Sequence, residues 1–167
     1  GGVKLVHFDS VTLVDLNPVF VELARITQTW LVATMDWRHV AEMAKEPPHG
    51  WKFIRFGVWV KPDGAPQFTG DRPGPGWEAL CFMHRDLPGR MRWNGGGRSS
   101  AWIHGVARGG DHPTGKPLGL VSDWVRLFTS PGDTVVDPFA GSGTSLVAAK
   151  TEGRRAVGVE IDERYCE

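Results

Sequence analysis

The sequence predicts a three-layer α/β domain whose sheet is mostly parallel, with one antiparallel strand near an edge. Runs of β-branched and apolar residues alternate with segments whose apolar positions recur at helical spacing. Acidic residues follow directly after several of the strand-like runs. Two runs, residues 53–60 and 77–83, are joined by a loop instead of a helix, which an antiparallel pair permits and a parallel pair does not.

The first part of the chain predicts a strand, a helix, a second strand and a second helix. Residues 3–8 form a strand-like run that ends at Asp9 and Ser10. Apolar residues at helical spacing predict a helix over residues 19–29, and residues 30–35 are typical of a buried strand ending at an acid. A short helix is expected at residues 37–45, where two prolines follow.

Two long irregular segments separate the middle elements. Residues 61–76 are too rich in Pro and Gly for regular structure and too long for a tight hairpin turn. Residues 85–110 contain five arginines but one acid, together with three consecutive glycines. We expect both segments to be loop insertions with a functional role.

The last part of the chain predicts a helix, a strand, a second helix and a second strand. An apolar stripe at i, i+3, i+4 and i+7 from Val121 predicts a helix that Pro131 and Gly132 interrupt. A β-branched run then ends at Asp137, and a further helix is expected through residues 145–150. The run at residues 155–159 delivers Glu160 to the same edge of the sheet.

The stretch from Asp137 to Thr144 indicates a ligand site. It joins a strand end to a helix start through a turn that contains Gly141 and Gly143. Glycine lets a ligand approach the backbone, and the free N–H groups of a helix start favour an anionic or zwitterionic ligand. A phosphate-binding P-loop is excluded because Pro117 follows the chain's one Gly-Lys pair, and a dinucleotide fingerprint is excluded because Leu146 stands where its third glycine is needed.

The octapeptide Asp-Pro-Phe-Ala-Gly-Ser-Gly-Thr resembles, at every position, the S-adenosylmethionine-binding motif of the DNA methyltransferases that modify exocyclic amino groups, the N6-adenine and N4-cytosine enzymes. The resemblance extends over almost the whole chain, with the motifs in permuted order and the cofactor motif near the C-terminus. It implies a single Rossmann-like methyltransferase domain over residues 1–167. The octapeptide residues that it assigns to the cofactor are Asp137, Pro138, Phe139, Ala140, Gly141, Ser142, Gly143 and Thr144.

The same resemblance implies four further cofactor residues. Glu160 takes the place of the acid that meets the ribose hydroxyls. His112 and Lys116 belong to a His-Pro-Thr-x-Lys-Pro segment that resembles the family's cofactor-flanking motif. Asp9 stands where an acid approaches the adenine, although Phe8 replaces the usual glycine.

Arginines and one tryptophan suggest contact with double-stranded DNA. Arginines can hold phosphates or read guanine edges, and a tryptophan can stack on bases or act as a wedge. The alternative is a surface excursion whose tryptophan packs back onto the body. We expect DNA contact from residues 61–76 and 85–110, in particular from Arg72, Arg90, Arg92, Trp93 and Arg98.

The catalytic residues are not evident. Members of the family hold the flipped target base with Asp/Asn/Ser-Pro-Pro-Tyr/Phe, and the sequence contains no such tetrapeptide. Residues 46–49 have the two prolines with the wrong ends, while Asn17, Pro18 and Phe20 form a degenerate match with Val19 in place of the second proline. The interpretation we prefer is that a segment between about residues 10 and 18 is missing from this sequence, together with a central strand and the tetrapeptide.

We therefore expect a methyltransferase of a restriction-modification system that acts on a flipped base in DNA, with adenine N6 favoured. The alternatives are cytosine N4, RNA or a protein amide as acceptor, and a non-catalytic module of the same fold that binds cofactor or DNA. A homodimer is left open. We expect no metal.

Composition limits the remaining classes. A chain that is 41% hydrophobic and 23% charged, with zero net charge, is an ordinary globular domain. Cys81 and Cys166 are too few for a disulfide framework and neither follows a proline, so a cytosine-C5 type nucleophile is not expected. Without an apolar run long enough for a membrane span, we expect a cytoplasmic protein, bacterial or phage-encoded and associated with the nucleoid.

Overall fold

The computed structural model describes residues 12–107 and 115–165. The expected strand at residues 3–8, Asp9, His112 and Cys166 lie outside the described residues. The helices and strands are, in chain order, α1 (Leu13–Ile26), β1 (Trp30–Met35), α2 (Trp37–Lys45), β2 (Trp51–Val60), β3 (Trp77–Arg85), β4 (Ala101–Ile103), α3 (Leu118–Phe128), β5 (Thr134–Asp137), α4 (Thr144–Thr151) and β6 (Arg155–Gly158), followed by a 3₁₀ turn at Glu163–Tyr165.

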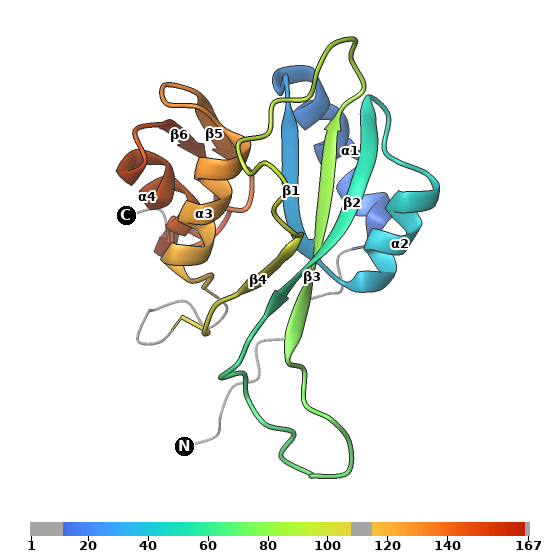
Figure 1. Cartoon of the computed structure of the whole chain (residues 1–167), viewed down its shortest axis with the longest axis vertical. Coiled ribbons are helices and arrows are strands. Elements are labelled where there is room, and N and C mark those ends of the chain that lie inside the picture. The colour runs from blue at the N-terminus through green and yellow to red at the C-terminus, as the bar shows by residue number, and fades with distance from the viewer. Residues whose placement is uncertain (1–11, 108–114, 166–167) are drawn as a thin grey trace.

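The strands form a four-stranded sheet in the order β1-β3-β2-β4 and a separate parallel pair, β5-β6 (Figure 1). β3 runs antiparallel to both of its neighbours, while β2 and β4 are parallel. The α/β class is confirmed and the expected antiparallel strand is present. The expectation of a mostly parallel sheet is corrected, because β3 returns directly from β2 and inserts between β2 and β1, which makes two of the four ladders antiparallel.

Helices cover both faces of the four-stranded sheet. Side chains that alternate along β3 separate the two cores, because successive residues of a strand point to opposite faces. Cys81 and Met83 pack with α1 and α2, whereas Leu80 and Phe82 pack with Phe128 of α3. Burial raises the pKa of the Cys81 thiol to about 12, which makes this cysteine a poor nucleophile.

α1 starts six residues before the expected helix and ends at Ile26, three residues earlier than predicted. A capping box explains the early start: the Asp15 N–H donates to Thr12 Oγ1 at 3.3 Å, and the Thr12 N–H donates to Asp15 Oδ2 at 2.9 Å. Hydrogen bonds from Thr12 lower the pKa of Asp15. Pro18 lies inside the helix, where it cannot donate a backbone hydrogen bond and its ring crowds the carbonyl of the preceding turn.

β1 and α2 have the predicted bounds, but β1 is half-buried along its whole length instead of buried. Its second edge pairs with no strand among the described residues, and neither does the second edge of β5. Thr29, just before β1, and Asp133, just before β5, line the same small polar pocket. The two strands therefore begin next to each other, each with one edge that no described strand pairs with.

The direction of each strand decides where the long loops lie. The loop at residues 61–76 joins the carboxyl end of β2 to β3, so it lies at the end of the sheet where β1 also finishes. β3 runs back, and Arg85 at its end donates its N–H to Thr29 O at 2.8 Å. The chain after β3 therefore lies at the opposite end of the molecule, as Figure 1 shows. Among the described helices, none is long and apolar enough to cross a membrane.

Candidate functional site

A tight turn follows β5 and leads into α4. Asp137, the last residue of β5, accepts a hydrogen bond from the Phe139 N–H at 2.9 Å through Oδ1. Its other oxygen, Oδ2, accepts from the Ser145 hydroxyl in the first turn of α4. Asp137 therefore fixes the strand end, the turn and the helix start to one another, and Ser145 is a part of this arrangement that the sequence did not reveal.

Both glycines of the turn adopt left-handed backbone conformations. Gly141 has φ of 51° and Gly143 has φ of 76°, a region that residues with a Cβ rarely occupy. Gly143 is the N-cap of α4 and provides no side-chain oxygen to satisfy the first N–H groups of the helix. The helix start is consequently left with donors and a positive dipole end for a ligand.

Glu160 joins this turn from the neighbouring strand. β5 and β6 pair in parallel, with Asp137 opposite Gly158, so Glu160 emerges beside the glycine turn. Its Oε2 accepts from the Gly141 N–H at 2.7 Å, and its Oε1 accepts from the N–H groups of Ile161 and Asp162, both at 2.9 Å. These backbone hydrogen bonds, from Asp162 first and then from Gly141, lower the pKa of Glu160, which keeps the carboxylate charged.

β6 lies close against the turn. A Cβ added at Gly158 would meet Leu146 Cδ1 at 2.7 Å and the Ala140 Cβ at 3.0 Å. Ala140 also donates its N–H to Val159 O at 3.0 Å. This glycine is a second position that motif matching missed, because its role is to let two elements approach each other.

The structure thus brings the predicted octapeptide and Glu160 together at one edge of the β5–β6 pair. We call this group, residues 137–144 and Glu160, the β5–β6 cradle. Phe139 is 63% exposed and Ser142 is also exposed, so both are accessible to a ligand. The rest of the octapeptide is half-buried. A ligand in this cradle would meet a carboxylate on one side and helix-start N–H groups on the other.

Lys116 takes part in a different cluster. Its Nζ lies 3.4 Å from Glu78 Oε2 and 5.9 Å from the centre of the Trp59 ring. Lys61 Nζ pairs with the other oxygen of Glu78 at 2.5 Å and lies over the same ring. In this structure the Lys116 ammonium is therefore directed towards β2 and β3.

The degenerate match to the catalytic tetrapeptide lies inside α1. Asn17 and Pro18 are exposed, but the Phe20 ring is 5% exposed and packs in the core. Its carbonyl accepts the indole N–H of Trp51 at 2.9 Å. A buried ring in a helix is not available to stack on a flipped base, and the segment does not follow a strand.

The residues expected at DNA separate into two groups. Arg72 is exposed on the loop at the carboxyl end of β2. Arg92 is exposed at the opposite end of the sheet, where it lines a pocket with Thr29, and the exposed Arg90 belongs to the same segment after β3. Trp93 packs against Phe128 with ring centres 4.9 Å apart and donates its indole N–H to Gly96 O at 2.7 Å. The alternative of a tryptophan packed back onto the body is therefore the one found.

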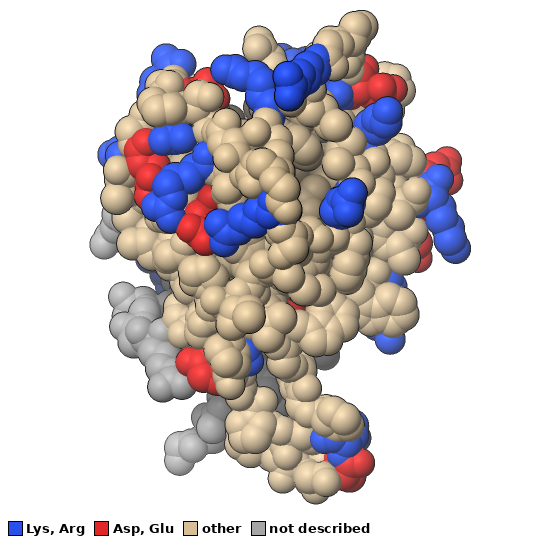
Figure 2. All heavy atoms as spheres, viewed as in Figure 1, with Lys and Arg blue, Asp and Glu red and all other residues tan. Residues whose placement is uncertain are grey.

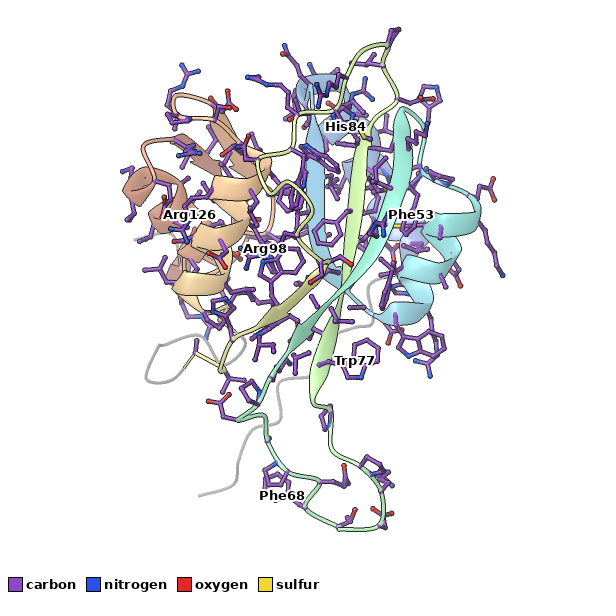
Figure 3. The ribbon with its side chains drawn as sticks, in the orientation of Figure 1. Phe53, Phe68, Trp77, His84, Arg98 and Arg126 are labelled. Carbon is purple, nitrogen blue, oxygen red and sulfur yellow. The ribbon has the colours of Figure 1, made fainter. Side chains whose placement is uncertain are left out.

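Arg98 is held by α3. Its guanidinium pairs with Asp123 at 3.2 Å and lies 5.8 Å from the centre of the Trp102 ring. Figure 3 shows Arg98 directed to the same helix as Arg126, which pairs with Asp123 and with Glu152 of α4. This charge network fastens the segment after β3 to α3 and α4.

An apolar hollow of about 470 Å³ lies between α2 and the β2–β3 pair. Phe53 and Trp77 of its lining face this side in Figure 3. The lining is almost wholly apolar, so it offers little to recognise an amino group by hydrogen bonding. Within residues 12–107 and 115–165, no group of three His, Cys, Asp or Glu side chains could hold a metal ion.

Comparison with known proteins gives one consistent family. A family model described as DNA methylase, of the N6/N4 methyltransferase type, matches residues 19–167. The type II methyltransferase M.XycI of Xanthomonas campestris pv. cyanopsidis is 33% identical over 127 residues, which cover 70% of this chain and 42% of that protein. M.Cfr9I of Citrobacter freundii is 31% identical over 142 residues, covering 78% of this chain and 46% of its own length. This chain spans less than half of both relatives.

Solved structures show the same similarity. The M1.HpyAVI–SAM complex superposes with a TM-score of 0.76 at 24% identity, over 90% of this chain and 78% of that one. TTHA0409 of Thermus thermophilus, in its complex with S-adenosyl-L-methionine, has a TM-score of 0.66 at 27% identity, over 92% of this chain and 72% of that one.

Proposed function

Because this chain belongs to the DNA methylase family of N6 and N4 amino-methyltransferases, we propose that its β5–β6 cradle binds S-adenosylmethionine for methyl transfer to an exocyclic amino group in double-stranded DNA. When bound, this cofactor supplies an electrophilic methyl group on a sulfonium. We favour adenine N6 as acceptor and keep cytosine N4 as the alternative.

One observation carries the cofactor assignment: the Glu160 carboxylate contacts the glycine turn that Asp137 organises. A carboxylate beside a helix start suits a nucleoside with a zwitterionic tail, because ribose hydroxyls can donate to Glu160. The carboxylate end of the methionine part would gain from the N–H groups at the start of α4. His112, Lys116 and Asp9 remain proposed contributors by family resemblance only.

The acceptor side requires hydrogen-bond acceptors at the amino group. The nitrogen lone pair is delocalised into the base, so the protein must hold both amino hydrogens to make the nitrogen nucleophilic. Members of the family do this with a tetrapeptide that this sequence lacks. We propose that a segment carries it in the natural polypeptide, together with a central strand. Of the range expected from the sequence, about residues 10 to 18, the continuous helix α1 and its cap at Thr12 leave only the part ahead of Thr12.

Two features support such a segment. β1 and β5 begin side by side, and within the described residues each has an unpaired edge. An insertion just ahead of Thr12 would leave the capping box of α1 intact. Intact-mass measurement and peptide mapping of the protein from its natural host test this, and a mass equal to that of these 167 residues would refute it.

A second candidate function is a non-catalytic module that binds cofactor or DNA. The absence of the tetrapeptide from the sequence favours it. It differs from the leading proposal in one measurable respect, because it binds S-adenosylmethionine without transferring the methyl group.

The deciding experiment supplies the full polypeptide with radiolabelled S-adenosylmethionine and duplex DNA, followed by digestion to nucleosides. Label in N6-methyladenine supports the favoured acceptor, and label in N4-methylcytosine supports the alternative. Cofactor binding without a labelled nucleoside supports the non-catalytic module. Label in RNA or protein, but not in DNA, would overturn the choice of substrate.

A further inference from the structure

The loop between β2 and β3 holds one aromatic ring almost completely in solvent. Phe68 is 90% exposed at the tip of this loop (Figure 3). The tip is a closed turn, in which the Gly70 N–H donates to Gln67 O at 3.1 Å and Gly70 has φ of 65°. Gln67 also donates from its amide to Thr69 Oγ1 at 2.8 Å. The turn thus has its own hydrogen bonds and presents the ring outward.

The base of the loop is anchored to the sheet. The Lys61 N–H donates to Gly76 O at 2.8 Å, and the Lys61 ammonium pairs with Glu78 at 2.5 Å. Between these points the loop projects from the body of the molecule as two limbs (Figure 1). Each limb has about seven residues and can reach up to about 20 Å, which exceeds the depth of a DNA groove, about 8 Å.

The surroundings of Phe68 indicate how the ring is used. Its neighbours Gln67, Thr69, Asp71 and Arg72 are polar or charged, so the ring does not belong to a contiguous apolar patch of the kind that protein partners bury. Figure 2 shows one basic and one acidic group at this projection amid uncharged surface. A single ring on a nearly neutral arm with an anchored base matches the insertion of one side chain between base pairs.

We propose that Phe68 is a wedge that enters the base stack of duplex DNA and occupies the space left when the target base leaves it. This inference rests on the proposed function, since it requires DNA as substrate. The loop lies at the carboxyl end of β2, the end of the sheet at which β1 also finishes. Phe68 is a positioning residue: it holds the DNA open and touches none of the reacting atoms.

The wedge is tested through DNA topology, which requires no methyl transfer, on a large plasmid that presents many candidate target sequences. Nicked plasmid is sealed by ligase in the presence of the full-length protein, and the topoisomers are separated on agarose. Filter binding sets the concentrations so that each variant covers the plasmid equally. An inserted ring unwinds the duplex, so the unsubstituted protein is expected to shift the linking number, whereas Phe68→Ala shifts it little or not at all.

The affinity of each variant for duplex DNA gives a second measure of the wedge. Loss of one stacked ring is expected to weaken duplex binding about 5- to 140-fold, and Phe68→Leu should lie between the two proteins. Val21→Ala is the control, because Val21 is 39% exposed on α1, outside both segments that are expected at DNA. Its topoisomers and affinity should equal those of the unsubstituted protein.

The outcomes separate the wedge from the function. Binding without any topological shift, or an equal shift by Phe68→Ala, overturns the wedge and leaves the proposed substrate standing. No binding of the unsubstituted protein to duplex DNA overturns both. If methyl transfer is detected, Phe68→Ala should lose activity on duplex DNA but keep it on heat-denatured DNA, and an equal loss on both refutes the inference.

Discussion

Replacement of Gly143 by alanine tests whether the cradle depends on a left-handed backbone position. Gly143 has φ of 76° and ψ of 19° at the N-cap of α4. An L-residue in this region costs about 1–2 kcal/mol. The new Cβ would lie 3.8 Å from Leu146 Cδ1, which is ordinary contact and adds no steric term. For a chain of this size each kcal/mol lowers Tm by about 2–4 °C, so the expected decrease is about 2–8 °C.

Calorimetric Tm values of Gly143→Ala and two other glycine variants show whether the left-handed backbone conformation causes the loss of stability. Gly76→Ala is the control, since its φ is not left-handed and a Cβ there meets nothing within 4 Å; its Tm should change by about 1 °C or less. Gly158→Ala adds a purely steric change against Leu146 and Ala140 and should lose about 1–3 kcal/mol. If Gly143→Ala unfolds at the same temperature as Gly76→Ala, the cradle does not depend on this backbone conformation.

Three further predictions concern the charged groups. Asp137→Ala releases the Phe139 N–H and the Ser145 hydroxyl, so calorimetric titration should show no binding of S-adenosylmethionine; unchanged affinity would contradict the assignment. In the folded protein the pKa of Glu160 lies below its ordinary value of 4.5. The charged carboxylate therefore contributes its full stabilisation above pH 4.5, and this contribution is lost as the pH falls through the folded-state pKa. The Tm difference between the unsubstituted protein and Glu160→Gln should accordingly shrink below pH 4.5. Arg72→Ala should reduce the salt dependence of DNA binding by about one ion, whereas Arg92→Ala, at the other end of the sheet beside Thr29, should leave it unchanged; equal effects would contradict this placement.

The parts of the fold that the sequence predicted well are those determined locally. α2 and β1 have the predicted bounds because proline, acid and apolar signals lie within a few residues of each end. The glycine turn after Asp137 is likewise local, since its hydrogen bonds join residues that are close in the chain. Glu160 was placed correctly because one short crossover fixes how β5 and β6 pair.

The parts that the sequence missed depend on contacts between distant residues. Nothing in the sequence around β3 indicates that this strand inserts between β1 and β2, and that insertion decides where the following arginines lie. Trp93 was expected at DNA, but its ring packs against Phe128. The sequence around Trp93 does not reveal this contact, because Phe128 lies in a helix far along the chain. The early start of α1 was missed because the capping box of Thr12 and Asp15 determines it, whereas apolar residues at helical spacing begin only at residue 19.

The edges of β1 and β5 that pair with no strand in the described part of the chain connect the cofactor half of the proposed site to its acceptor half. Both strands begin at the pocket lined by Thr29 and Asp133, so a strand inserted between them could pair in parallel with each. Strands pair at about 4.8 Å, and the inserted strand would join the two sheets into one. Its carboxyl end would emerge between Asp36, which follows β1, and Asp137, which ends β5. A tetrapeptide at that end would place hydrogen-bond acceptors for the amino group next to the cradle, which is the arrangement that direct methyl transfer requires.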